Sequence, residues 1–422
     1  MIDINVIRKN PDIIKQAAKD KGFTVDIDKI LALDSTLRET TNEIDNMRSE
    51  RNRLSKLIPA CTDAAEKETL TEQVRLLKTE LAAQEALARE SRKEFENLML
   101  YVPSIPAPEV PFGKGEEDNV ELRRVGVVRE FDFPFKDHVE LCELHNMIDI
   151  PRATKIAGSR SYYLKNKAVL LEMAISRFVI DFLAARGFTP MSVPHLVKEN
   201  AMRGTGYFPI GRDQAYSIEE DELFLIGTSE VSLVSYHENE ILPMDSFPIK
   251  YTGISPSYRR EAGTYGRDTR GLYRVHQFQK VEQVVFCEAD ETKAEALHYE
   301  LLENAEAIMR ALELPYRICL ACTGEIGIGQ TRKHELETWM PSRKAYCETH
   351  SCSTLGDFQA RRLGIRYRDN SGEMKYAFTL NNTGIAFPRV LIPLLENHQN
   401  ADGSINIPKA LQAYMGLDKL MV

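Results

Sequence analysis

Two long stretches near the amino terminus place mostly apolar residues three or four positions apart. In the first stretch the repeating positions are Leu33, Leu37, Thr40, Ile44, Met47, Arg51, Leu54 and Ile58. In the second they are Leu70, Val74, Leu77, Leu81, Gln84, Ala88, Ser91, Phe95 and Leu98. Such spacing keeps one stripe of a helix against a partner helix. The pattern therefore predicts two helices, each about 45 Å long, paired as an antiparallel coiled-coil hairpin over about 28–100.

The regions flanking the hairpin have different patterns. A shorter helix is predicted before it, opened by Asn10 and Pro11 and closed by Gly22. After it, residues 101–119 contain four prolines and two glycines, which is typical of a stiff linker, although a surface loop within one domain is the alternative. We therefore predict a first domain at 1–105, a linker at 106–119 and a second domain at 120–422.

The second domain mixes helical and strand patterns. Residues 166–187 carry the apolar stripe of a long helix, which a strand follows. Residues 250–261 and 273–286 are rich in β-branched and aromatic residues and enclose a glycine-rich turn, so they predict an antiparallel hairpin. Residues 378–387 favour another strand, followed by a helix with Arg389 near its start.

Composition narrows the class of protein. The 422 residues are 43% hydrophobic and 28% charged, as expected for a globular protein with a sizeable core. No apolar run of about 18 residues and no signal peptide is present, so we expect no membrane span and a cytoplasmic location. Seven scattered cysteines fit reduced thiols better than a disulfide framework.

One stretch concentrates positive charge although the chain carries a formal charge of -9. It holds five arginines within sixteen residues, namely Arg259, Arg260, Arg267, Arg270 and Arg274. Guanidinium groups suit phosphate because they donate two parallel hydrogen bonds and stay charged. In the predicted hairpin Arg274, Phe278 and Glu282 share one face, where the ring would stack on a base and the carboxylate would hold an ammonium group. A solvated, salt-bridged strand pair is the alternative.

The wording of this stretch, RREAG followed by RDTRGLYRVHQF, closely resembles motif 2 of the seryl-tRNA synthetase family, a class II aminoacyl-tRNA synthetase family. Residues 166–194 resemble the family's motif 1, which forms a dimer interface, although a core helix and strand explain the same letters. Residues 378–399 resemble motif 3. The resemblance covers essentially the whole chain and implies an α+β fold: a coiled-coil arm and a catalytic domain built on a mostly antiparallel sheet flanked by helices.

The resemblance implies a ligase that attaches L-serine to tRNA(Ser) through a seryl-adenylate, with ATP and Mg²⁺ as cofactors. It further implies serylation of selenocysteine tRNA, tRNA(Sec), and a homodimer. The arm would grip the long variable arm of the tRNA. The charge pattern alone favours a solvated helix face for its cations, which are Arg48, Arg51, Arg53, Lys56, Arg89, Arg92 and Lys93.

By the same resemblance, the ATP-binding residues are Arg259, Arg260, Glu261, Arg274, Val275, Phe278, Glu348, Thr349, His350, Ser351 and Arg389. Arg259 and Arg389 would be catalytic. Arg259 would hold the α-phosphate and Arg274 the γ-phosphate, while Glu261 would read the adenine edge. Phe278 and Arg389 would cover the two adenine faces. Glu348 and Ser351 would place Mg²⁺, since carboxylate and hydroxyl oxygens suit a hard cation, although from the residues alone they are equally typical of a loop, as plain turn residues.

The serine-binding residues implied by the resemblance are Thr228, Ser229, Glu230, Arg259, Glu282 and Thr383. Thr228 and Glu230 near an apolar run are also a helix-capping signal. Four cysteines, Cys319, Cys322, Cys347 and Cys352, suggest a zinc site, but their spacing is loose and Cys319 falls within an apolar strand, so we disfavour zinc.

Three other functions remain open from the sequence. A synthetase-like ligase that loads a small amino acid onto a carrier protein would lack the long arm. A non-catalytic synthetase paralogue would be favoured by loss of Arg259, Glu348 or Arg389, and all three residues are present. A coiled-coil interaction protein would explain residues 28–100 and nothing after them.

Overall fold

The computed structural model describes residues 1–264, 266, 268 and 270–422, so Arg267 of the arginine cluster lies outside the described residues. The chain divides into two compact units. The first comprises Ile2–Lys19 and Phe23–Pro103, and the second comprises Met1, Asp20–Gly22 and Ser104–Val422.

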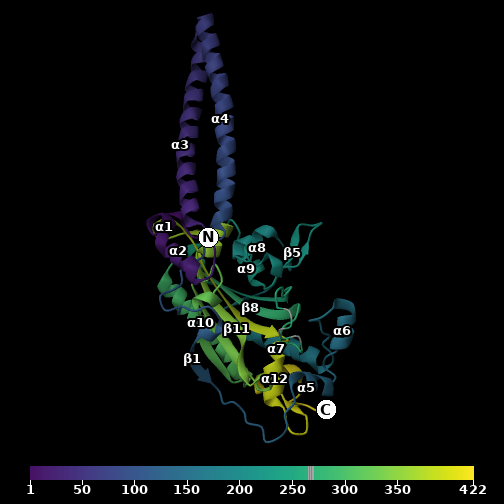
Figure 1. Ribbon diagram of the computed structural model, residues 1–422. Helices are drawn as coiled ribbons and strands as arrows, with labels where there is room; N and C mark the ends of the chain where they lie inside the picture. The colour runs from purple at the N-terminus through teal and green to yellow at the C-terminus, as the bar shows by residue number, and fades with distance from the viewer. Residues whose placement is uncertain (265, 267, 269) are drawn as a thin grey trace. The chain divides into compact units, whose positions relative to one another are not determined.

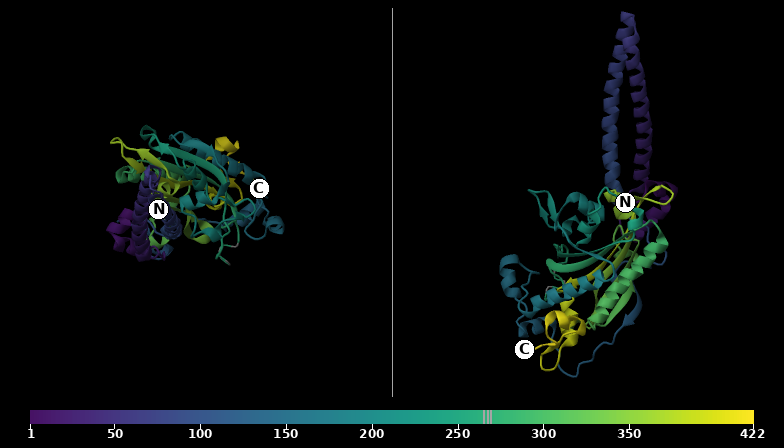
Figure 2. Two further views of the ribbon diagram at one scale, coloured as in Figure 1. Left: turned by 90° about the horizontal axis from the view of Figure 1, so that it is seen from above. Right: turned by 180° about the vertical axis from the view of Figure 1, so that it is seen from behind.

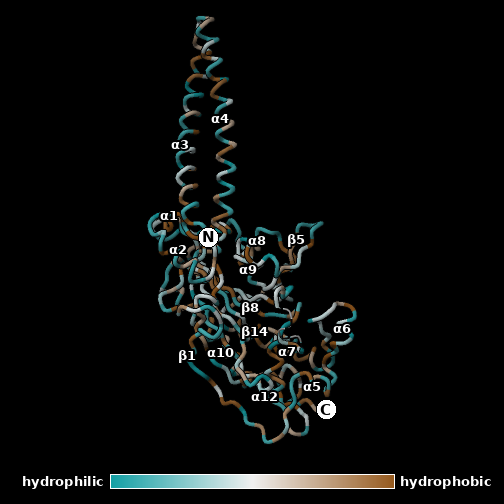
Figure 3. Tube along the Cα trace, in the orientation of Figure 1, coloured by the Kyte–Doolittle hydropathy of each residue, from teal (hydrophilic) through white to brown (hydrophobic). Residues whose placement is uncertain are grey.

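Two long helices dominate the first unit, α3 (Ile27–Leu57) and α4 (Ala64–Met99), which run side by side in opposite directions (Figure 1). Every position of the predicted seam is buried or half-buried, including the polar ones. Figure 3 shows apolar residues recurring along both helices between hydrophilic stretches. The predicted coiled-coil hairpin is therefore confirmed.

Local capping sets the ends of these helices. Asp26 accepts a hydrogen bond from the backbone N–H of Lys29, and Asp63 accepts one from that of Ala65. Before them, α2 (Pro11–Asp20) begins at Pro11 as predicted, because proline at the first helical position removes no needed donor. The short helix α1 (Ile4–Lys9) is an addition that the sequence pattern did not predict.

Among the described residues, eight strands form the central sheet of the second unit in the order β1-β9-β10-β11-β14-β8-β7-β2. In that order they are β1 (Val120–Val125), β9 (Tyr316–Leu320), β10 (Arg332–Met340), β11 (Ala345–Gly356), β14 (Phe378–Phe387), β8 (Gln277–Cys287), β7 (Ile249–Tyr258) and β2 (Thr189–Ser192). Neighbours pair antiparallel except β2 with β7, which pair in parallel. The α+β class is confirmed.

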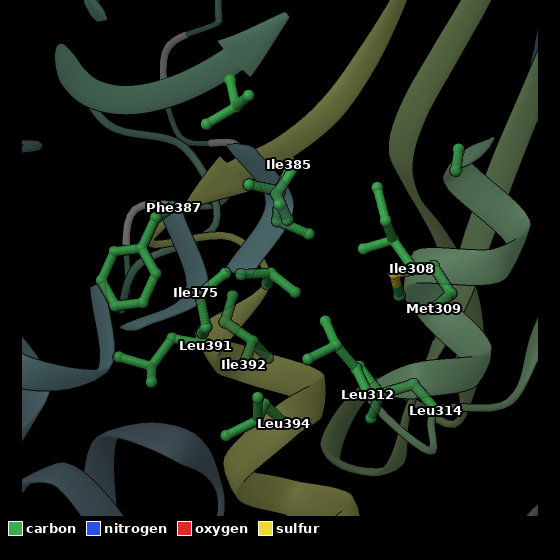
Figure 4. Close-up of a cluster of buried hydrophobic side chains, with 14 of the residues drawn as sticks. Ile175, Ile308, Met309, Leu312, Leu314, Ile385, Phe387, Leu391, Ile392 and Leu394 are labelled. Carbon is green, nitrogen blue, oxygen red and sulfur yellow. The ribbon is translucent and has the colours of Figure 1, made fainter. Parts of the chain in front are cut away.

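Helices cover both faces of this sheet. One face packs on α7 (Lys167–Ala184), α10 (Glu291–Ala311) and α12 (Leu391–His398) (Figure 2). Figure 4 shows this core, where Ile385 and Phe387 of β14 gather with apolar side chains of the three helices. The smaller helices α8 (Glu199–Thr205), α9 (Glu230–Ser235) and α11 (Phe358–Leu363) share a second apolar cluster with Val284 and Phe286 of β8. The two faces of β8 therefore contact different cores.

The predicted strand hairpin is present, but its strands are shorter than expected. Tyr258 pairs with Gln277, so β7 and β8 are antiparallel neighbours that end at this pair. Arg259, Glu261 and Arg274 consequently lie in the connection between the strands rather than on them. Glu261 adopts a left-handed backbone conformation with φ 51°, which an extended strand does not allow.

The segment that carries Glu348 and Ser351 is a second difference from expectation. Both residues lie on β11, where they pair with β10, and not in a loop. The sequence YCETHSCS is polar and lacks the alternating apolar pattern by which a strand is predicted. A strand can have this composition when its polar side chains line a cavity.

Candidate active site

A cavity of about 330 Å³ opens on the face of the sheet that carries Phe278, Lys280 and Glu348. Its walls come from β8, β11, β14 and the connection between β7 and β8. These strands are neighbours in the sheet, so residues far apart in sequence meet across adjacent strands. Most of the predicted nucleotide residues line this cavity: Arg259, Glu261, Arg274, Val275, Phe278, Glu348, Thr349, Ser351 and Arg389.

Two predicted nucleotide residues lie elsewhere. Arg260 lines a separate cavity of about 930 Å³ together with Arg212, and its guanidinium donates to the backbone carbonyl of Asp213 at 3.3 Å. His350 is buried, with ring nitrogens 2.9 Å from Thr349 Oγ1 and 3.1 Å from the carbonyl oxygen of Gly384. Its neighbours Thr349 and Ser351 line the cavity, and a register shift in the β10–β11 pairing beside Thr349 brings Glu348 to the cavity as well.

Arg259 and Phe278 form one wall of the cavity. The guanidinium carbon of Arg259 lies 5.3 Å from the centre of the Phe278 ring, and its Nε donates to the carbonyl of Gly227 at 3.3 Å. The ring and the backbone bond together fix the cation in place, so that a positive charge and an aromatic face are presented side by side.

Arg389 approaches the cavity from the end of β14. Its Nη1 donates to the carbonyl of Glu348 at 3.1 Å and lies 3.7 Å from the Glu348 carboxylate. The guanidinium carbons of Arg389 and Arg343 lie 4.5 Å and 4.0 Å from the centre of the Tyr273 ring. Tyr273, which was not among the predicted site residues, thus contacts two cations at the cavity wall.

Two residues in the connection pair with each other. Arg274 Nη1 donates to Glu261 Oε2 at 2.6 Å, and Arg274 also lies 3.6 Å from Asp268. Glu261 and Arg274 were predicted to bind opposite ends of one nucleotide. A ligand that used both would therefore exchange this ion pair for bonds of its own.

The predicted serine residues are mostly buried deeper than the cavity wall. Thr383 lines the cavity, and Glu282 faces Thr383 across the β8–β14 pair. Thr228 and Glu230 are buried where α9 begins, and Thr228 Oγ1 accepts from the Glu230 N–H at 3.3 Å, but the N-cap residue of α9 is Ser229, whose side chain makes no capping bond. Ser229 turns away, because its hydroxyl donates to the carbonyl of Gly253 at 3.3 Å.

Glu230 is held by three neutral donors that the sequence did not reveal. Gln359 Nε2 and Asn381 Nδ2 donate to Oε1 at 2.8 and 2.7 Å, and the Tyr207 hydroxyl donates to Oε2 at 3.1 Å. Burial raises the pKa of Glu230, and the hydrogen bond from Gln359 and the charge of Lys280 oppose the rise. The donors lie 129, 151 and 23 residues from Glu230, so no local motif links them to it.

Glu282 is supported differently, by an ion pair with Lys280. Burial raises the pKa of Glu282 to about 7, against the opposing attraction of Lys280. Lys280 Nζ also donates to Thr228 Oγ1 at 3.2 Å. Lys280 was not a predicted site residue, although two-residue alternation between Phe278 and Glu282 pointed to it.

Glu348 and Ser351 fit a hard divalent cation. Both side chains line the cavity, and they offer only oxygen ligands. Burial alone would raise the pKa of the Glu348 carboxyl. The opposing effect of four nearby cations is larger, so the pKa is lowered overall; they are Arg389, Lys333, Arg259 and Lys280. Glu348 therefore remains a carboxylate, the form that coordinates Mg²⁺.

Neither a zinc site nor a membrane-spanning helix is found in the part of the chain that the structure describes. The four cysteines considered for zinc are free thiols, and burial raises the pKa of Cys319 to about 12. No cluster of three His, Cys, Asp or Glu side chains suited to a metal occurs among the described residues. Within the same residues, no helix is both long and apolar enough to cross a bilayer.

Comparison with known proteins agrees with this geometry. Residues 1–106 match the family model described as the seryl-tRNA synthetase N-terminal domain, and residues 215–398 match the tRNA synthetase class II core domain (G, H, P, S and T). The chain is 47% identical to the serine--tRNA ligase of Deinococcus radiodurans, over 99% of this chain and 98% of that protein. It is 42% identical to the enzyme of that name from Dictyoglomus turgidum, over 100% and 99%.

Solved structures give the same relationship. The seryl-tRNA synthetase from Pyrococcus horikoshii complexed with ATP superimposes with a TM-score of 0.92 at 36% identity, over 99% of both chains. The cytoplasmic serine-tRNA ligase from Naegleria fowleri in complex with AMP superimposes with a TM-score of 0.86 at 28% identity, over 99% of this chain and 98% of that one.

Proposed function

The chain belongs to the seryl-tRNA synthetase family, and from this premise we propose that its cavity makes seryl-adenylate from L-serine and ATP and transfers the seryl group to tRNA(Ser). In the first step a serine carboxylate oxygen attacks the α-phosphorus and the bond to pyrophosphate breaks. In the second step the 3'-hydroxyl of the terminal tRNA adenosine attacks the acyl carbon and AMP leaves. The observation that carries this proposal is that Arg259, Phe278 and Arg389 line one cavity.

The nucleotide is assigned to the cavity by its charges and rings. The adenine lies between the Phe278 ring and the Arg389 guanidinium, with Glu261 at its edge. Arg259, held against Phe278, faces the α-phosphate, where negative charge grows as the carboxylate attacks. Arg274 takes the γ-phosphate after releasing Glu261. Phosphoryl transfer of this kind needs positioning and charge stabilisation and no side-chain nucleophile.

Mg²⁺ is the second cofactor of the proposal. Glu348 and Ser351 would hold it, and it would neutralise charge on the phosphates. Arg389 supports this proposed Mg²⁺ site, because its hydrogen bond to the backbone carbonyl of Glu348 holds that residue in position.

Serine is assigned to a cluster of four buried side chains beside the cavity, which we name the serine compartment. Thr228, Glu230, Glu282 and Thr383 offer hydroxyl and carboxylate groups to its ammonium and hydroxyl. A site that bonds a hydroxyl rejects an amino acid without one, such as alanine, by a factor of about 10⁴, because its buried polar groups would then lack partners.

The arm is assigned to tRNA by its exposed cations. Arg48 and Arg53 are exposed and paired with Glu85 and Glu50, and Arg89, Arg92 and Lys93 of α4 are exposed as well. Exposed cations along one helix suit a phosphate backbone. The proposal extends to tRNA(Sec), following the family resemblance, and a charging assay with a tRNA(Sec) transcript tests that part.

A homodimer and a cytoplasmic location complete the proposal. The strand β2 ends the sheet, so one of its edges lacks a neighbouring strand among the described residues. On α7, Leu170 and Met173 are 45% and 64% exposed although they are apolar. A second copy that covered this helix and strand would remove apolar surface from water.

The alternatives fit less well. A carrier-protein ligase does not explain the match of residues 1–106 to a seryl-tRNA synthetase N-terminal domain. A non-catalytic paralogue does not explain why Arg259, Glu348 and Arg389 all line the cavity.

Aminoacylation of total tRNA with each of the twenty amino acids tests the function. We expect serine to be charged and the others to remain at background. Glu282→Ala should lose serine-dependent ATP–pyrophosphate exchange and keep its circular dichroism spectrum. Glu300→Ala, on the exposed side of α10, is the matched control and should keep exchange. Preferential charging of another amino acid would overturn the specificity.

A further inference from the structure

Lys280 lies between the nucleotide cavity and the buried serine compartment. Its side chain lines the cavity, yet the residue is only 7% exposed. Its ammonium group contacts the Glu282 carboxylate and donates to Thr228 Oγ1 at 3.2 Å. One lysine thus joins two residues from different elements, β8 and the segment before α9.

Other ionisable groups surround this ion pair from several elements. They are Arg259 after β7, Tyr207 after α8, Glu230 on α9, and Glu348, His350 and Cys352 on β11. Glu230 disfavours ionisation of Glu282, whereas Lys280 and Arg259 favour it. In the part of the chain that the structure describes, Lys280 is the cation in ion-pair contact with Glu282.

The two buried carboxylates of the compartment are stabilised in unlike ways. Glu230 accepts hydrogen bonds from three neutral donors, whereas Glu282, which is 2% exposed, has the charge of Lys280 beside it. A buried carboxyl group that loses its cation takes up a proton, because an isolated charge is unstable away from water. Glu282 should therefore depend on Lys280 for its charge far more than Glu230 does.

We propose that Lys280 is a positioning residue for serine, which keeps the Glu282 carboxylate ionised and fixed beside Thr228 before the amino acid arrives. The inference rests on the proposed function, since it assumes that serine binds at Glu282. The direct contacts of the Lys280 ammonium group are with Glu282 and Thr228, so its loss should weaken serine binding far more than ATP binding.

The direction of the pH effect follows from the ion pair. The burial that raises the pKa of Glu282 to about 7 remains when Lys280 is replaced, and the opposing attraction is lost. The pKa of Glu282 should then rise further, so the carboxylate would be protonated at a higher pH than in the wild type. The acid limb of kcat/KM for serine should move to higher pH.

The experiment compares Lys280→Met with the wild type in serine-dependent ATP–pyrophosphate exchange between pH 6 and 9. We expect KM for serine to rise about tenfold or more at pH 7.5, and KM for ATP to stay within about threefold. The acid limb should move up by about one pH unit or more. Lys280→Arg keeps the charge and should retain the wild-type acid limb.

The control is Lys250→Met. Lys250 also lies on a strand of this sheet and pairs with a glutamate, Glu300, at 2.6 Å, but outside the cavity. It should leave both KM values unchanged. If Lys280→Met does not fold, Lys280→Arg decides: an unmoved acid limb supports the role of the charge, and a limb moved by one unit overturns it.

Equal rises of both KM values, or an unchanged serine KM and acid limb in Lys280→Met, would also overturn the inference while leaving serine activation intact. Absence of serine-dependent exchange in the wild type would instead contradict the proposed function.

Discussion

Arg389 and Tyr273 contact each other twice: the guanidinium carbon lies 4.5 Å from the centre of the ring, and Arg389 Nε donates to the Tyr273 carbonyl at 3.3 Å. The residue assigned to one face of the adenine is therefore oriented by a residue of the connection between β7 and β8. The residue proposed to bind ATP and the connection between β7 and β8 are thus joined by two contacts.

Tyr273→Leu should weaken ATP binding. The substitution removes the ring that contacts both Arg389 and Arg343, and a contact of this kind is worth about 0.5–2 kcal/mol, so KM for ATP should rise about 2- to 30-fold. ATP–pyrophosphate exchange at saturating serine measures it. Tyr273→Phe retains the ring and is the control. An unchanged KM in the leucine variant would show that the contact does not position Arg389.

Gln359→Leu should weaken serine binding indirectly, through the hydrogen bond that Gln359 donates to Glu230. Glu230 would lose one of its donors, and leaving a buried charged group short of a bond costs about 1–3 kcal/mol. KM for serine should rise about 5- to 150-fold, and more steeply as pH falls, because the pKa of Glu230, already raised, would rise further. Asn304→Leu removes an equally buried amide outside the cavity and should lower stability without changing KM.

The chain should lose stability as pH falls from about 6.5 to about 4. His298 and His334 are bonded to each other at 2.7 Å, and burial lowers the pKa of His298 and lowers that of His334 to about 4. In the unfolded chain these histidines bind protons near pH 6.5, whereas in the folded chain they do so only at lower pH. The free energy of unfolding is therefore unaffected by them above that pH and declines below it. Urea unfolding at pH 4.5, 6 and 7.5 measures the decline, which should be shallower in His334→Asn. Equal slopes in both proteins would contradict this prediction.

Two leucines of α4 should behave oppositely. Leu81 is 5% exposed in the seam and Leu87 is 57% exposed. Leu81→Ala should destabilise the hairpin by about 2 kcal/mol or more, whereas Leu87→Ala should change little. Hydrogen exchange of α3 and α4 measures this. If the arm binds tRNA, Leu81→Ala should also lower tRNA charging while ATP–pyrophosphate exchange persists, and parallel loss of both activities would argue against a separate role for the arm.

Met173→Glu should weaken self-association. A charge on the exposed apolar face of α7 would have to be buried if a second copy covered that helix. Light scattering across a concentration series should show a shift towards monomer. Val127→Glu introduces the same charge at a residue that is 89% exposed, and it should leave the mass unchanged. A monomeric wild type at all concentrations would remove the homodimer from the proposal.

Hydrophobic periodicity predicted the parts of the fold in which apolar residues mark the buried face. The seam from Leu33 to Leu98 was predictable because every position in it faces the partner helix. The polar strand β11 was not, because Glu348 and Ser351 point into a cavity, and their letters match those of a surface loop. Strand alternation did predict that Phe278 and Glu282 share a face.

The other differences from expectation come from contacts between distant parts of the chain and from the directions that neighbouring side chains take. Gln359 and Asn381 reach Glu230 over more than a hundred residues, so only the assembled sheet brings them together. Arg260 was assigned to ATP by the family resemblance, and its side chain diverges from that of Arg259 where the chain leaves β7 and lines another cavity.

The two sides of β8 place a strict demand on its alignment. Lys280 and Glu282 face the ligand compartment, while Val281 and Val285 between and beyond them belong to the apolar core. Deleting or inserting one residue earlier in this strand would move Lys280 and Glu282 to the apolar core and would move the valines to the side that faces the ligand. A change in the length of this strand should therefore disrupt both folding and catalysis. The strand can accept substitutions, but not insertions or deletions.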